Sequence, residues 1–206
     1  MKKEKYGPHQ KYGPYRPLLI SEEDRRDSIK KNKPALFEIN ERRKPQNNAE
    51  RDRFNDAKRK AENFAVDLRT LDIAGKIAVQ KNDQKIVRYS QKHNMDPDMV
   101  RAIIYAENAR GYYGYPVDMI GLSKSVFPMN IRPNIWSDLI DGKEKDLYDP
   151  NYNVKTGVLL LSRIRDRVQK PTPQKIGSLW NSLSGTHITE FGDYVGTVYK
   201  DKPWKK

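Results

Sequence analysis

The chain has 206 residues and no cysteine, and its 40 Lys and Arg outnumber its 27 Asp and Glu, which gives a formal charge of +13. This length suits one domain with an extension, and the missing cysteines exclude disulfide scaffolds, thiolate metal sites and cysteine nucleophiles. The charge favours a polyanionic partner, such as nucleic acid, anionic lipid or an anionic cell-wall polymer.

The sequence favours neither a membrane span nor a leader. Its longest clean aliphatic stretch is residues 158–161, far short of the roughly 18 residues that a membrane helix needs. The basic start at residues 1–3 is typical of a signal peptide, but residues 6–10 are not apolar, so we expect no Sec-type export. We also expect no metal site, because no ligand-like spacing relates the three histidines, His9, His93 and His187.

Residues 1–48 are expected to form a basic, extended and largely disordered arm. This segment is rich in proline and poor in clustered hydrophobic residues, as segments without a core usually are. Two Tyr-Gly-Pro units, at residues 6–8 and 12–14, leave open that the arm docks onto a partner or onto its own domain. A solvated tail is the simpler interpretation.

Residues 49–84 are expected to form a helical extension. Over residues 49–71, apolar side chains recur every three or four positions on a charged background, which predicts an amphipathic helix. We expect Gly75 to end this helix. A second helix should then start at residue 76 or 83 and run to His93.

Residues 85–206 carry the strongest helix-start signals, so the folded core is expected there. Three residue pairs place a capping side chain directly before a proline: Asp96-Pro97, Asp149-Pro150 and Thr172-Pro173. A last short helix should run from about Thr189 to Lys200. No alternating, β-branched runs compete with these helices, so we predict an almost wholly α-helical fold.

One acidic residue lies on the apolar face of the first of these helices. The stripe formed by Val100, Ile103 and Ile104 continues at helical spacing to Glu107. Burial raises the pKa of a carboxyl group, as a general acid requires if it is to hold its proton near neutral pH. The alternative is a frayed helix end at which Glu107 faces solvent. A loop rich in glycine and tyrosine follows at residues 108–116, and aromatic rings beside a shielded acid are common in sugar sites.

Residues 96–107 resemble the catalytic-Glu helix of the lysozyme-like superfamily, in particular that of soluble lytic transglycosylases and goose-type lysozymes. Four later segments resemble the rest of the family's pattern, in order: residues 127–131 for Gly-Leu-Met-Gln, 149–161 for the helix with Asp-Pro and a run of Leu, 179–181 for Tyr-Asn, and 194–199 for the terminal Tyr-Val segment. The resemblance covers about residues 85–204 and leaves the first 80 or so residues unmatched.

The resemblance implies a two-lobed helical domain that binds peptidoglycan glycan strands and cleaves between N-acetylmuramic acid and N-acetylglucosamine, with no cofactor. It implies that Glu107 is the general acid, which protonates the glycosidic oxygen. The family's terminal tyrosine, which hydrogen-bonds the acid, maps onto Tyr194, with Tyr199 close behind. The other implied substrate-binding residues are Asn108, Tyr113, Met129, Asn130 and Asn181. Packing or capping is the alternative role, above all for Met129 and Tyr199.

Two departures and the reaction outcome stay open. Asn108 stands where the family has Ser, and Asn130 stands where it has Gln, which alters the reach of both side chains. A lytic transglycosylase needs one carboxyl group and closes a 1,6-anhydro ring, whereas an inverting hydrolase needs a second carboxylate about 6.5–9.5 Å away. Asp118 is the candidate for this second carboxylate, and its alternative role is to cap the next segment.

The implied substrate lies in the periplasm or cell wall, although no Sec signal is recognised. We therefore expect a secretion apparatus or a phage route to deliver the chain, as an antibacterial effector or a phage lysin, with an inhibitor (immunity) protein in the producing cell. Two alternatives stay open: a basic nucleic-acid-binding protein, for which no binding motif is present, and a catalytically inactive glycan-binding relative. Glu107 has no purpose in the first alternative.

Overall fold

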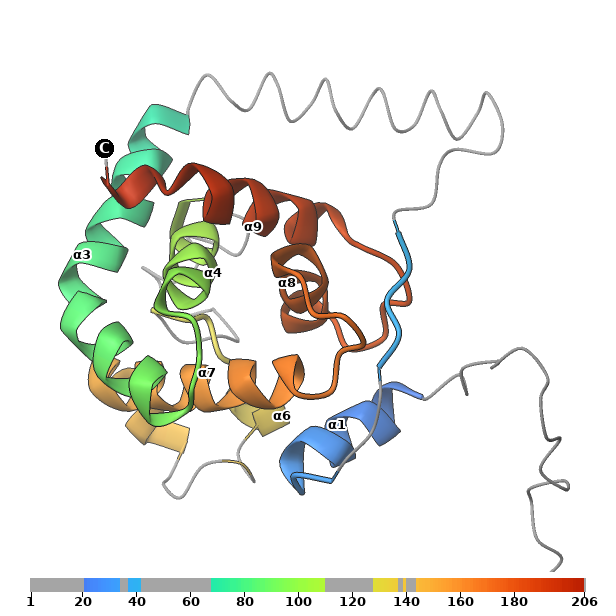
Figure 1. The fold of residues 1–206 in the computed structure, drawn as a ribbon. Helices are drawn as coiled ribbons and strands as arrows, with labels where there is room; N and C mark the ends of the chain where they lie inside the picture. The colour runs from blue at the N-terminus through green and yellow to red at the C-terminus, as the bar shows by residue number, and fades with distance from the viewer. Residues whose placement is uncertain are drawn as a thin grey trace, which may run out of the picture.

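The computed structural model describes residues 21–33, 37–41, 68–109, 128–136, 139 and 144–205. This part of the chain is predominantly helical (Figure 1) and contains no strand beyond two isolated bridges. The prediction of an all-α fold is confirmed. Within the same ranges, no helix combines the length and the apolar character that crossing a membrane requires.

The helices surround a central one, α4 (Figure 1). In chain order the elements are α1 (Glu22–Lys30), α3 (Leu68–Lys92), α4 (Pro97–Ala109), α6 (Pro133–Trp136), the 3-10 turn η3 (Glu144–Tyr148), α7 (Pro150–Arg165), α8 (Pro173–Asn181), α9 (Glu190–Asp201) and the 3-10 turn η4 (Pro203–Lys205). Helix α4 packs against α3 and α9, while α3 also contacts α7, and α8 contacts α9. The apolar stripe of α4 is therefore covered by its neighbours.

Side-chain caps start the helices where the sequence predicts them. Asp96, Asp149, Thr172 and Thr189 each accept a hydrogen bond of 2.9–3.3 Å from a backbone N–H in the turn that follows. Each such cap satisfies a donor that has no partner inside its helix and contributes about 1 kcal/mol. The last predicted helix, from about Thr189 to Lys200, agrees with α9 within one residue at each end.

The prediction that Gly75 ends a helix is wrong, because α3 continues through it without a break. A Cβ atom at this position would lie 2.9 Å from Cβ of Ala109 and 2.9 Å from Cδ2 of Tyr105. Glycine is therefore needed for the close approach of two helices, and its poor helix propensity, about 1 kcal/mol, is offset by packing. Residues 49–67 of the predicted amphipathic helix lie outside the described residues.

Helix α3 also crosses the predicted boundary between residues 84 and 85. Val79 lies before this boundary and Ile86 after it, and both side chains are buried in the same core. The helix contacts both α4 and α7. The described part of the expected extension thus belongs to the main helical body.

Part of the expected disordered arm is folded onto this body, which corrects the prediction for residues 21–33 and 37–41. Ser21 caps α1, and Ile29, Phe37 and Ile39 are buried in the core. Parallel bridges pair Phe37 with Val168 and Asn40 with His187. The few apolar residues of the segment cannot make a core of their own, but they complete one that the C-terminal helices supply. Both Tyr-Gly-Pro units lie outside the described residues.

A buried arginine connects α1 to the chain beyond α8. Arg25 donates from Nη1 to the carbonyl oxygens of Leu183, at 2.8 Å, and Gly185, at 2.6 Å. Its guanidinium also lies over the ring of Phe37, 5.5 Å from the centroid. These contacts hold the N-terminal segment against residues 183–185.

Two arginines of the C-terminal half form hydrogen bonds with the C-terminal end of α1 and the residues that follow it. Arg163 donates to the carbonyl oxygens of Ile29 and Lys30, at 2.9 and 2.8 Å. These carbonyl groups lie in the last turn of α1, where no N–H of the helix itself is available to them. Arg167 donates to Ser28 Oγ at 3.0 Å and to the carbonyl oxygen of Lys33 at 2.9 Å. A cation at a helix C-terminus is also favoured by the helix dipole.

We expect Gly75→Ala to lower the free energy of unfolding by about 1–2 kcal/mol, because the added methyl group overpacks the contact with α4 by more than alanine gains in helix propensity. Urea denaturation measures this change. Gly185→Ala is the control, since a Cβ there would lie 3.6 Å from the carbonyl oxygen of Ser182, which is an ordinary van der Waals contact. A Gly75→Ala chain as stable as the original would contradict the close approach.

We expect Arg25→Met to release residues 21–41 and to lower the free energy of unfolding by about 2–3 kcal/mol, because two carbonyl groups lose their donor. Limited proteolysis with mass spectrometry should show new cleavage between residues 21 and 41. Lys31→Met is the control, since its side chain is 61% exposed and an exposed ion pair contributes little. Unchanged cleavage in Arg25→Met would show that Arg25 does not hold the segment.

Candidate active site

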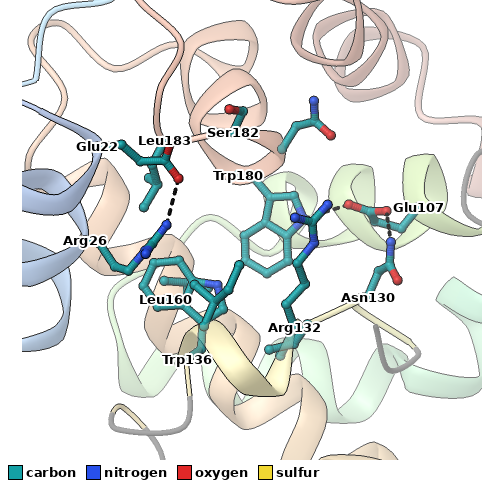
Figure 2. Close-up of a pocket in the computed structure, with 13 residues that line it drawn as sticks. Glu22, Arg26, Glu107, Asn130, Arg132, Trp136, Leu160, Trp180, Ser182 and Leu183 are labelled. Atoms are coloured by element: carbon teal, nitrogen blue, oxygen red, sulfur yellow. Dashed lines mark hydrogen bonds and ion pairs between the residues drawn. The ribbon is translucent and has the colours of Figure 1, made fainter. Parts of the chain in front are cut away.

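A pocket forms where five parts of the chain meet (Figure 2). Its walls come from Glu22 and Arg26 of α1, Glu107 of α4, Leu160 of α7, and two short segments at residues 130–136 and 180–183. Two tryptophans, Trp136 and Trp180, contribute aromatic surface. The pocket therefore combines charged groups with apolar rings.

Helix α4 carries Glu107 to this pocket. Val100, Ile103 and Ile104 are fully buried, and Glu107 follows on the same face, two residues before the helix ends at Ala109. Glu107 is partly buried as a whole, and its carboxyl group lines the pocket. The helical spacing thus leads to an enclosed position for this carboxyl group, as expected.

Each oxygen of the Glu107 carboxyl group accepts one hydrogen bond. Nδ2 of Asn130 donates to Oε2 at 2.9 Å, and Nε1 of Trp180 donates to Oε1 at 2.8 Å (Figure 2). Asn130 has a φ of 53°, in the left-handed region that asparagine tolerates better than most residues. A turn at Asn130 and the end of α8 at Trp180 therefore converge on one carboxyl group.

Burial raises the pKa of Glu107 to about 7 from its ordinary value of 4.5. The hydrogen bonds from Asn130 and Trp180 and the charge of Arg132 act in the opposite direction, because they favour the ionised form. Burial outweighs them. The carboxyl group is therefore close to half protonated at neutral pH. The protonated fraction can donate its proton, as a general acid does.

Two asparagines, the half-buried Asn108 and the fully buried Asn153, fix the turn that presents Asn130. Nδ2 of Asn108 donates to the carbonyl oxygen of Pro128 at 2.9 Å, which connects the end of α4 to this turn. Asn153, which is 0% exposed, accepts from the backbone N–H of Met129 at 3.0 Å. Asn108 does not line the pocket, and its hydrogen bond to Pro128 makes it a support for the turn that carries Asn130.

Three other predicted residues do not line the pocket. Met129 is fully buried against α7, where a Cβ at Gly157 would come within 3.2 Å of its Cβ. Tyr199 donates its hydroxyl to Asp96 at 2.6 Å, and this hydrogen bond raises the pKa of Tyr199 to about 12. Tyr194 packs against the core from α9 and is not among the residues that line the pocket. For Met129 and Tyr199 the packing or capping alternative is the one that the contacts fit.

Of the remaining predicted residues, Asn130 and Asn181 line the pocket with Glu107. Tyr113 and Asp118 lie outside the described residues. Among the described residues, no group of three or more His, Asp or Glu side chains is placed to hold a metal ion.

Several pocket residues were not expected from the sequence: Glu22, Arg26, Arg132, Trp136 and the indole donor of Trp180. Trp180 lies in the segment that resembles the family's Tyr-Asn. Its indole N–H could therefore have been predicted from the sequence as a hydrogen-bond donor to Glu107. Glu22 and Arg26 form an ion pair of 2.7 Å at the spacing of one helical turn. That pattern is too common on helix surfaces to indicate a site.

Comparisons of the chain with protein-family models, curated proteins and solved structures found no match. The function proposed for the chain therefore rests on the chemistry of its pocket and on the resemblance of its sequence motifs.

The raised pKa of Glu107 predicts a specific dependence of stability on pH. Between the unfolded value of 4.5 and the folded value of about 7, the folded chain binds more protons at Glu107 than the unfolded chain does. The contribution of Glu107 is therefore fully present below pH 4.5 and is lost as the pH rises through 7.

We expect the stability of the original chain relative to Glu107→Gln to fall by about 3 kcal/mol between pH 4.5 and pH 8. Urea denaturation of both proteins at the two pH values measures this difference, and the comparison cancels every group that titrates equally in both. A difference that does not change with pH would show that the pKa is not raised.

Proposed function

We propose that the chain is a peptidoglycan-cleaving glycosidase that acts between N-acetylmuramic acid and N-acetylglucosamine, with Glu107 as its general acid. The observation that carries this proposal is a carboxyl group of pKa about 7, held by two donors in a pocket lined by tryptophans. The sequence resemblance of residues 85–204 supports the same reaction.

The first step is proton transfer from Glu107 to the glycosidic oxygen while positive charge develops on the sugar. Glu107 becomes a carboxylate as the bond breaks. Asn130 and Trp180 then donate to a charged acceptor, which strengthens both hydrogen bonds in the transition state. The donors that favour the ionised form in the free protein would therefore assist the reaction.

Trp136 and Trp180 provide surface for the sugar rings. Both side chains line the pocket on the way from Arg26 to Glu107 (Figure 2). Indole rings offer a large apolar surface, which suits the apolar face of a sugar ring. Leu160 adds apolar surface from α7.

The product distinguishes two forms of this activity. One carboxyl group suffices for a lytic transglycosylase, and Glu107 provides it. The other carboxylate among the described residues of the pocket belongs to Glu22, which forms an ion pair of 2.7 Å with Arg26. An inverting muramidase would need a base such as Asp118.

The charge of +13 supports binding to an anionic wall polymer, and we expect this contribution to weaken as salt is added. Action in the periplasm or cell wall, delivery by a secretion apparatus or phage route, and an inhibitor (immunity) protein are further parts of the proposal. They follow from the location of the proposed substrate.

The test is mass spectrometry of the soluble products after purified sacculi are incubated with the original chain. We expect Glu107→Gln to release at least a hundredfold less product, because a positioned general acid contributes roughly 10²–10⁴-fold. Glu23→Gln is the matched control, since Glu23 is an exposed glutamate that does not line the pocket.

The kind of product decides between the two forms. Anhydro-muropeptides would establish a transglycosylase, whereas reducing-end muropeptides would establish a muramidase and predict that Asp118→Asn is inactive. Binding to sacculi without any release would favour an inactive glycan-binding relative. Affinity for duplex DNA that falls steeply with salt, and no affinity for sacculi, would favour a nucleic-acid-binding protein.

A further inference from the structure

Arg132 is a charged residue of the pocket that has no part in the proposed acid chemistry. It is exposed, and in Figure 2 its guanidinium extends toward Glu107 beside Trp180. The backbone beneath it is held in a turn, because its carbonyl oxygen accepts from the N–H groups of Ile135, at 3.1 Å, and Trp136, at 3.2 Å. The backbone position from which the Arg132 side chain extends toward Glu107 is therefore fixed.

The guanidinium of Arg132 makes no hydrogen bond or ion pair with any residue that the structure describes. The other charged side chains of the pocket, apart from Glu107, are Glu22 and Arg26, and these two pair with each other. The charge of Arg132 therefore acts on Glu107 across the pocket, where it favours the ionised form of the carboxyl group.

This arrangement changes when Glu107 is protonated, which is the state that a general acid needs at the start of the reaction. A neutral carboxyl group no longer balances the charge of Arg132. A substrate that carries a carboxylate would supply the missing counter-charge, and a guanidinium binds a carboxylate through two parallel hydrogen bonds.

We propose that Arg132 binds a carboxylate carried by the sugar strand next to the cleaved bond, so that the pocket selects acidic muramic acid strands over neutral polymers of N-acetylglucosamine. This inference rests on the proposed function and names the chemical feature by which the substrate is recognised. Asn130, two residues earlier in the same turn, binds Glu107, which keeps the selecting group and the acid in one small region.

Two sources could provide the carboxylate. A glycan without peptides carries a free lactyl carboxylate on each muramic acid. In a glycan with peptides, the lactyl group is amide-bonded, and the carboxylates belong to the peptide stem. The chemistry that Arg132 would recognise is the same in both, so the two ligands are compared directly.

The experiment measures binding by calorimetry to the full chain carrying Glu107→Gln, which prevents cleavage. The ligands are chitotetraose, a peptide-free tetrasaccharide of alternating N-acetylglucosamine and N-acetylmuramic acid, and the same tetrasaccharide with peptide stems. Arg132→Gln and Arg132→Lys are added to this background. Lys81→Gln, on an exposed position of α3, is the control for the loss of one positive charge.

We expect at least one acidic ligand to bind about tenfold more tightly than chitotetraose, as one charge-assisted pair would give. Arg132→Gln should remove this preference and leave chitotetraose binding unchanged, Arg132→Lys should restore part of it, and Lys81→Gln should keep it. The acidic ligand that shows the preference identifies the source of the carboxylate.

A preference that survives in Arg132→Gln, or equal binding of all three ligands before Arg132 is changed, would overturn this inference and leave the proposed glycosidase in place. The original chain is assayed on sacculi in parallel. If no glycan binds and no product is released from sacculi, the proposed function fails and this inference fails with it. Thermal unfolding of each variant checks that the exposed substitution has not altered the fold.

Discussion

Enclosing a carboxyl group costs free energy unless its oxygens receive donors, and Glu107 meets this constraint with one donor on each oxygen. Both donors must be held in place by structure outside the pocket. Asn130 depends on a turn that Asn108 and Asn153 fix through backbone groups. Trp180 depends on the end of α8, which packs against α9. The site is thus the meeting point of contacts made through most of the described chain.

The parts of this structure that the sequence predicted are those that depend on local spacing. The all-helical fold, the side-chain caps and the buried stripe of α4 each follow from residues a few positions apart. Glu107 was found in the same way, because three apolar residues at helical spacing define the face on which it lies. Asn130 and Asn181 were identified through the resemblance, and the structure brings both to the pocket.

The parts that were missed depend on contacts between distant segments. Glycine is the residue type that typically follows the end of a helix. Only the close approach of Tyr105 and Ala109 explains why Gly75 lies inside one. Segment 21–41 lacks enough apolar residues for a core, so nothing local predicts that it completes one. Met129 and Tyr199 were matched by order along the chain, which does not specify the direction in which a side chain points.

The hydrogen bond from Arg25 to Leu183 joins residues that are 158 positions apart, and it bears on when the pocket is completed during synthesis. Helix α1 leaves the ribosome long before its partners at residues 183–185, because they are made later in the chain. Contacts of such long range form late, since the loop between them must close first. A nascent chain therefore lacks the wall of its pocket that α1 provides until residues 183–185 have emerged.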